Sequence, residues 1–218
     1  MDKDKMQVEI WSDVMCPFCY IGKRKFEQAL AQFPEQEHIE VIWKSYQLAP
    51  DLVTDPKTNI HQYLAKHKGM SVEEAKGLNE YVTRMAAEVG LVYKLDQAVV
   101  ANSFDAHRFS HFAKQFNKQL EAEERLFQAY FTEGKNIDDH DTLLQLGTEI
   151  GLDATLLDIA LKNGSYTDEV RSDIYEAQQV GVRGVPFFVL DSKYSISGAQ
   201  DSKTFLQALT QAYNERNN

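Results

Sequence analysis

The chain has 218 residues, of which 43% are hydrophobic and 26% are charged, and its formal net charge is −10. This composition is typical of a folded globular protein with one sizeable core. The acidic balance argues against nucleic acid as a partner, because phosphate binding requires a basic face.

Membrane and secretory classes are also disfavoured by the sequence. Residues 1–5 carry no apolar run typical of a secretory signal, and no segment is long and apolar enough for a membrane span. We therefore expect a cytoplasmic protein that does not bind membranes. The chain has 2 cysteines. In a reducing compartment a close cysteine pair is typical of catalysis or metal binding rather than of a structural disulfide.

The first predicted elements are a strand, a helix and a strand. Residues 8–12 (VEIWS) are rich in strand formers, and apolar side chains at helical spacing follow Cys16. Pro17 suits the first turn of that helix, where a missing N–H is tolerated. Residues 39–48 (IEVIWKSYQL) predict a second strand, which favours a right-handed βαβ crossover.

Between about residues 54 and 180 the apolar periodicity becomes helical, and we find no convincing strand there. Ser71 and Glu74 have the spacing of a capping box, and Gly69 and later glycines punctuate the helices like C-caps. The predicted helices are 59–68, 71–89, 101–117, 119–133, 140–150, 153–162 and 166–180.

Strand signals return after Gly181. Residues 185–190 (VPFFVL) and 194–197 (YSIS) predict two strands, and an amphipathic helix follows at about 201–214. The predicted fold class is therefore α/β, with a βαβ…ββα domain interrupted by a large all-helical insertion. We place the first part of the α/β domain at 1–53, the insertion at 54–180 and the second part at 181–218.

Cys16 and Cys19 stand where the first strand gives way to a helix, in the order Cys-Pro-Phe-Cys. A thiolate is the nucleophile in disulfide exchange, and the dipole and free N–H groups of a helix N-terminus favour negative charge. Cys19 lies on the same helical face, where it is placed to attack a mixed disulfide on Cys16. The pair is therefore a candidate dithiol centre.

Two other interpretations of the pair stay open. A C-x-x-C sequence is also half of a zinc site, and His107 and His111 share one predicted helix face as a candidate second half. Their separation from the cysteines is unlike compact zinc-finger spacing, so we favour redox chemistry without a metal. Two inert buried cysteines are the third interpretation, which the opening turn of a helix disfavours.

The segment Gly184-Val185-Pro186 precedes the predicted third strand. Proline cannot donate to a sheet ladder, so the strand should begin after it. About 5–6% of X–Pro bonds in folded proteins are cis, and general statistics favour trans. A cis bond would bring this loop against the dithiol and leave the Val185 backbone free to pair with an extended substrate.

Motifs that stand in order along nearly the whole chain carry a resemblance. They are 11–22 (WSDVMCPFCYIG), 102–108 (NSFDAHR), 184–188 (GVPFF) and 196–200 (ISGAQ). They resemble the DsbA-like thioredoxin family, and within it the FrnE-like branch often described as polyketide-biosynthesis dithiol-disulfide isomerases.

The resemblance implies a thioredoxin fold split by a helical domain, and a thiol-disulfide oxidoreductase or isomerase. It implies that the partners are proteins with thiols or disulfides, and that no cofactor is needed beyond the redox-active disulfide. Glutathione is a candidate co-substrate. It implies that Cys16 and Cys19 are the catalytic thiols. It implies active-site support from Pro17, Phe18, Val185 and a cis Pro186. The candidate substrate or glutathione contacts are Trp11, Asn102, His107 and Arg108, the last two on a cleft-facing helix.

One departure from the wider family concerns Phe18. Strongly oxidising members carry His between their cysteines, so Phe18 predicts a less oxidising disulfide here.

Two other function classes share features with this sequence. Glutathione-dependent 2-hydroxychromene-2-carboxylate isomerases and kappa-class glutathione transferases look similar in layout, but typically have Ser at the position of Cys16. Two cysteines favour redox exchange, which needs a resolving thiol. A non-catalytic peptide-binding or zinc-binding module is the alternative of another class, with Trp11, Phe18 and Tyr20 as an exposed apolar rim. Nothing in the sequence points to a particular oligomeric state.

Overall fold

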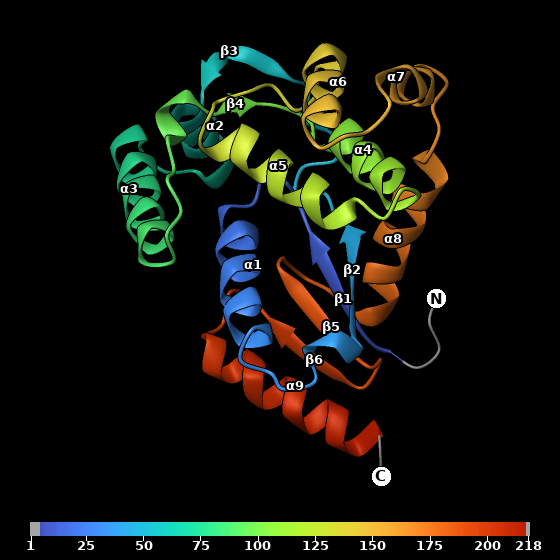
Figure 1. Cartoon of the computed structure of the whole chain (residues 1–218). Coiled ribbons are helices and arrows are strands. Elements are labelled where there is room, and N and C mark those ends of the chain that lie inside the picture. The colour runs from blue at the N-terminus through green and yellow to red at the C-terminus, as the bar shows by residue number, and fades with distance from the viewer. Residues whose placement is uncertain (1–4, 217–218) are drawn as a thin grey trace.

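The computed structural model describes residues 5–216 and is built around a four-stranded sheet with the order β2-β1-β5-β6 (Figure 1). Strand β1 (Met6–Ser12) pairs in parallel with β2 (Ile39–Ser45). Its other edge pairs antiparallel with β5 (Phe187–Leu190), which pairs antiparallel with β6 (Tyr194–Ser197). The first and last parts of the chain therefore meet at β1.

Helices cover both faces of this sheet (Figure 1). Helix α1 (Pro17–Leu30) joins β1 to β2 as the predicted crossover, and it packs with α9 (Ser202–Arg216) on one face. Helix α8 (Thr167–Val180) lies against β2 on the other face. Side chains of β1 alternate between the two faces, so that Ile10 joins the α1 core and Trp11 joins the α8 side.

All seven helices predicted between residues 54 and 180 are present near their predicted positions. Besides α8 they are α2 (Ile60–Lys68), α3 (Val72–Glu88), α4 (Phe104–Lys114), α5 (Gln119–Phe131), α6 (His140–Glu149) and α7 (Ala154–Lys162). Two short 3-10 turns, Gln36–His38 and Leu95–Gln97, lie in the connections. The predicted capping box of Ser71 and Glu74 is confirmed. The domain boundaries stay a prediction.

The prediction that residues 54–180 contain no strand is wrong. Strand β3 (Asp55–Asn59) pairs antiparallel with the two residues of β4 (Val99–Val100), with an irregular register. The β3 sequence, DPKTN, is mostly exposed and has turn-like composition without apolar alternation. Its strand conformation therefore depends on pairing with β4, a tertiary contact that the local sequence does not indicate.

Helix α4 is shorter than the predicted 101–117. Its start is delayed because the Asn102 side chain accepts a hydrogen bond from the Phe104 N–H, which forms a turn before the helix. Beyond its end, Asn117 adopts a positive φ of 55°. Strand β5 begins directly after Pro186, as the missing N–H requires. No helix among residues 5–216 has both the length and the apolar character to cross a membrane.

Candidate active site

The two cysteines lie at the start of α1. Cys16 is the N-cap, Pro17 is the first helical residue, and Cys19 follows within the first turn. The Cys16 N–H donates to the Asp13 carbonyl at 2.9 Å, and the Cys19 N–H donates to the Cys16 carbonyl at 3.0 Å. Both are free thiols, with Cys16 4% exposed and Cys19 0% exposed. Both cysteines are therefore buried, and Cys19 lies deeper in the helix turn than Cys16.

The loop before β5 closes over Cys16 from the far end of the chain. The Val185–Pro186 peptide bond is cis. The Cys16 thiol donates to the Val185 carbonyl oxygen at 3.4 Å. Gly22 on α1 permits this approach, because a Cβ there would lie 2.9 Å from Cγ of Pro186. The loop thus brings a backbone acceptor against the outer thiol.

The environments of the two thiols differ. Burial raises the pKa of the Cys19 thiol, and the neighbouring Cys16 raises it further, whereas the Ser12 hydroxyl and the Asp13 backbone lower it. Cys16 occupies the N-cap of α1, next to the unpaired N–H groups of the first helical turn. A dithiol with one sulfur at the helix N-terminus and the other fully buried behind it is suited to sequential disulfide exchange.

The side chain of Asp13 organises the segment that leads into Cys16. Its carboxylate accepts from the Met15 N–H at 3.1 Å and from the Leu48 N–H at 2.7 Å. It is fully buried and ties this turn to the loop after β2. Leu48, which this contact holds in place, is 51% exposed, and Phe18 between the cysteines is 38% exposed. Exposed apolar side chains therefore lie next to Cys16 in the turn, at Phe18, and on the loop that Asp13 holds, at Leu48.

Tyr93 supports the cysteine turn from the helical region. Its hydroxyl donates to the Pro17 carbonyl at 2.7 Å. Its ring stacks on Phe131, with centroids 4.6 Å apart, and Tyr20 stacks on Phe127 at 4.9 Å. Tyr93 could not be identified from the sequence, because no motif surrounds it and its role depends on a contact 76 residues away in the chain.

An ion cluster joins α1 to α5 beneath these rings. Lys23, which is buried, contacts Glu124 at 2.6 Å, and Arg24 also binds this carboxylate. The Tyr20 hydroxyl donates to the same residue at 2.6 Å. Burial opposes the charged carboxylate, but these partners outweigh burial and lower the pKa of Glu124 to about 2. The helix that carries the cysteines is therefore fixed to the helical region by charge as well as by packing.

The candidate binding residues His107 and Arg108 are buried in the interior of the structure, and their contact with a ligand stays a prediction. His107 is buried, with Nε2 3.0 Å from the Tyr46 carbonyl and 3.8 Å from the Asp13 carboxylate. Burial opposes the imidazolium, but Asp13 outweighs it and raises the pKa of His107. The Arg108 guanidinium binds Asp105 and three carbonyls around the end of α7, at Ala160, Leu161 and Ser165. Both side chains therefore hold the interior together.

Asn102 is occupied in the same way. It accepts from Gln47 at 2.9 Å, and its amide donates to the Leu52 carbonyl at 2.8 Å. Together with the turn at Phe104, these bonds fix the loop after β2 to the start of α4. The polar atoms of Asn102 are engaged within the protein, which gives it a structural role, and the ligand contact stays a prediction.

The predicted exposed rim of Trp11, Phe18 and Tyr20 is wrong in two of its three members. Trp11 is 0% exposed, and its Nε1 donates to the Asp173 carbonyl at 3.0 Å. Tyr20 is buried in the aromatic stack. Strand β1 is central in the sheet, so its side chains are covered on both faces and Trp11 is not available to a ligand.

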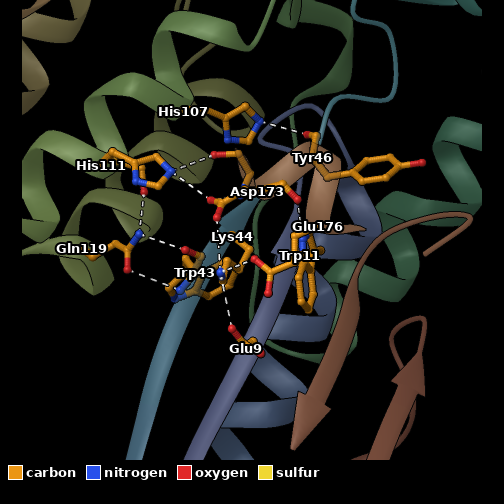
Figure 2. Close-up of polar contacts among 12 residues, drawn as sticks. Glu9, Trp11, Trp43, Lys44, Tyr46, His107, His111, Gln119, Asp173 and Glu176 are labelled. Carbon is orange, nitrogen blue, oxygen red and sulfur yellow. Dashed lines mark hydrogen bonds and ion pairs between the residues drawn. The ribbon is translucent and has the colours of Figure 1, made fainter. Parts of the chain in front are cut away.

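Asp173 on α8 is the centre of a buried polar network that Figure 2 shows. Its carboxylate lies 2.9 Å from Nε2 of His111, accepts from the Ser45 N–H at 2.9 Å, and contacts Lys44 at 3.4 Å. Burial opposes ionisation, but His111 and the Ser45 amide outweigh it and lower the pKa of Asp173. The network fastens α4 and α8 to β2.

This network also accounts for the second histidine of the zinc alternative. His111 is engaged with Asp173 and with the Ser45 hydroxyl at 3.2 Å. Within residues 5–216, no group of three or more His, Cys, Asp or Glu side chains is arranged to hold a metal ion.

Comparisons with known proteins agree with the geometry. The family model of the DSBA-like thioredoxin domain matches residues 7–210. A crystal structure of the probable DsbA oxidoreductase SCO1869 from Streptomyces coelicolor is 40% identical, with a TM-score of 0.91 over 96% of this chain and 91% of that one. The uncharacterized protein YwbO of Bacillus subtilis (strain 168) is 30% identical over 94% of this chain and 96% of its own.

A third similarity concerns the fold alone. The structure of a 2-hydroxychromene-2-carboxylate isomerase superposes with a TM-score of 0.71 at 16% identity, over 97% of this chain and 98% of that one. The same architecture therefore occurs in a protein described as a probable oxidoreductase and in one described as an isomerase, and the cysteine pair belongs to this chain's own sequence. The chain belongs to the DSBA-like thioredoxin family.

Proposed function

We propose that the protein is a thiol-disulfide oxidoreductase or isomerase that exchanges disulfides through Cys16 and Cys19. The observation that carries the proposal is the position of Cys16 at the N-terminus of α1, with its sulfur 3.4 Å from the Val185 carbonyl and Cys19 in the same turn. In the first step the Cys16 thiolate attacks a substrate disulfide, forming a mixed disulfide and releasing one substrate thiolate. Cys19 then attacks Sγ of Cys16 and releases the second.

The proposed substrates are proteins with exposed disulfides or thiols. Phe18 and Leu48 supply exposed apolar surface near Cys16, and the Val185 carbonyl is a backbone acceptor of the kind that an extended peptide can use. Small thiols such as glutathione are smaller substrates for the same chemistry. We place the activity in the cytoplasm, where a dithiol of this kind meets reduced thiol pools.

The first test is equilibration of the purified protein in glutathione buffers of graded potential, followed by alkylation of free thiols and intact mass measurement. We expect one two-electron transition in which both cysteines change together. Cys16→Ser should abolish exchange, and Cys19→Ser should trap a mixed disulfide on Cys16. Thiols that stay reduced throughout, or a single stable glutathione adduct on the unmodified pair, would reject the proposal in favour of a glutathione-dependent isomerase or transferase.

The alternative of a non-catalytic peptide-binding module is separated by the double variant Cys16→Ser with Cys19→Ser. Disulfide exchange should disappear in this variant. Suppression of client aggregation that is unchanged in the variant, without any exchange activity in the parent, would favour the binding module.

A further inference from the structure

Ser12 is the last residue of β1 and lies directly beneath the cysteine turn. Its backbone is fixed by the sheet, since Ser12 is in register with Ser45 of β2 and its carbonyl accepts from the Tyr46 N–H at 2.9 Å. Alternation along the strand turns its side chain toward the face that α1 covers, the face shared with Ile10. The side chain is therefore held on the cysteine side of the sheet.

The hydroxyl of Ser12 is buried and unpaired. The residue is 2% exposed, and among the side chains of residues 5–216 its Oγ finds no well-formed hydrogen-bond partner. A buried hydroxyl without a partner costs free energy, so native structures rarely keep one without a reason. Neighbouring strand positions hold apolar side chains, and an alanine here would avoid this cost.

The Cys19 thiol lies close enough to Ser12 for the hydroxyl to affect its pKa. Ser12 lowers the pKa of that thiol, although the dithiol form has no well-formed hydrogen bond between the two side chains. A neutral thiol is a weak hydrogen-bond partner, whereas a thiolate is a strong acceptor. The other titratable groups that face Cys19 are Cys16 in the same turn and Tyr93 from the segment after α3, and neither favours a negative charge on Cys19.

We propose that the Ser12 hydroxyl is a positioning residue that donates a hydrogen bond to the Cys19 thiolate during the second step of exchange. The proposal rests on the proposed function and assigns this one step to a side chain. The Cys19 thiolate attacks Sγ of Cys16, the Cys16–Cys19 bond forms, and the bond from Cys16 to the substrate sulfur breaks. The electron pair leaves with the substrate sulfur, which takes up the proton that Cys19 lost. The first step, attack by Cys16, does not need Ser12.

The size of the effect follows from general values. Losing a hydrogen bond to a charged group should raise the Cys19 pKa and lower the thiolate population by about 10- to 150-fold. A more basic thiolate is also a better nucleophile, which compensates about half of the loss in thiolate population. Ser12→Ala should therefore slow resolution of the mixed disulfide by about 3- to 12-fold, with little change in the rate at which it forms.

The test uses the full chain and oxidised glutathione as the probe. Rapid quenching and intact mass measurement give the rate of adduct formation on Cys16 and the rate at which the adduct resolves. We expect Ser12→Ala to prolong the adduct without slowing its formation, and Ser12→Thr, which keeps the hydroxyl, to restore the parent lifetime. An unchanged lifetime in Ser12→Ala would overturn the proposal.

A second measurement separates this proposal from the proposed function. In a Cys16→Ser background, the pH dependence of thiolate absorbance reports the Cys19 pKa without any exchange reaction. The pKa should rise in Ser12→Ala and return in Ser12→Thr. Equal Cys19 pKa values in the Ala and Thr variants would show that the hydroxyl is not responsible. If the parent protein instead lacks a two-electron transition, the proposed function fails, while this titration still decides the role of Ser12.

Discussion

Gly22 on α1 gives a sharp test of how the cysteine turn and the loop before β5 fit together. A Cβ built on Gly22 would lie 2.9 Å from Cγ of Pro186 and 3.5 Å from Cβ of Ala199. The proline ring is stiff, and it directly follows Val185, whose carbonyl accepts a hydrogen bond from the Cys16 thiol. The Gly22→Ala variant must therefore displace this loop or the first turns of α1.

The magnitude follows from two opposing terms. Replacing glycine by alanine inside a helix stabilises it by about 1 kcal/mol. Overpacking a closely fitted contact costs about 1–3 kcal/mol. Gly77, inside α3, is the matched control, because no described heavy atom lies within 4 Å of a Cβ built there. Gly77→Ala should stabilise the protein, and Gly22→Ala should be less stable than Gly77→Ala by about 1–3 kcal/mol.

Urea unfolding of both variants measures the difference, with the midpoint compared at equal slope. We also expect Gly22→Ala to reduce disulfide exchange, because the Val185 carbonyl moves away from Cys16, and Gly77→Ala to leave exchange unchanged. If Gly22→Ala is as stable as Gly77→Ala and exchanges disulfides at the parent rate, the close approach of Pro186 to α1 is not a constraint and the reasoning fails.

Three further predictions concern charge. Glu124→Gln should cost about 1–2 kcal/mol of stability at neutral pH, a value discounted because the side chain is 32% exposed. Because the pKa of Glu124 is lowered from 4.5 to about 2, this stabilisation is present above pH 4.5 and is lost as the pH falls toward 2. The free energies of unfolding of parent and variant, measured in urea, should therefore converge in acid. Asp173→Asn should cost about 3 kcal/mol, because it removes the buried carboxylate that pairs with the buried His111 and accepts from the Ser45 N–H. Exposed Asp168→Asn on the same helix should change the unfolding midpoint little. Phe18→His should make the disulfide more oxidising by about 30 mV or more in glutathione equilibration, and Phe18→Ala should not, since only an imidazolium stabilises the neighbouring thiolate.

The strand, turn and helix that position the two cysteines could be predicted from local sequence patterns. The strand at 8–12, the Cys-Pro-Phe-Cys turn and the following helix are encoded within one stretch of chain, where strand propensity changes to helical periodicity. The capping box at Ser71 is equally local. These features could be predicted because the groups that satisfy each other lie within a few residues.

Contacts between distant segments could not be predicted in this way. Arg108 was assigned to a cleft, but its guanidinium binds carbonyls that follow it by 52 to 57 residues. Strand β3 has no strand-like pattern, since its partner β4 determines its conformation. A motif match places a residue in a family, but it does not say which atoms that residue touches. The role proposed for the Ser12 hydroxyl could not be predicted from the sequence either, because Ser12 and Cys19 come together only in the folded turn.

The separation of 169 residues between Cys16 and Val185 has a consequence for the newly made chain. During synthesis the two thiols leave the ribosome long before the loop that closes over them. Until β5 arrives, β1 can pair only with β2, and its other edge is an unpaired strand edge open to foreign chains. The nascent protein therefore has an uncovered dithiol next to an unpaired, aggregation-prone strand edge. Residues 185–190 cover both when they fold against β1.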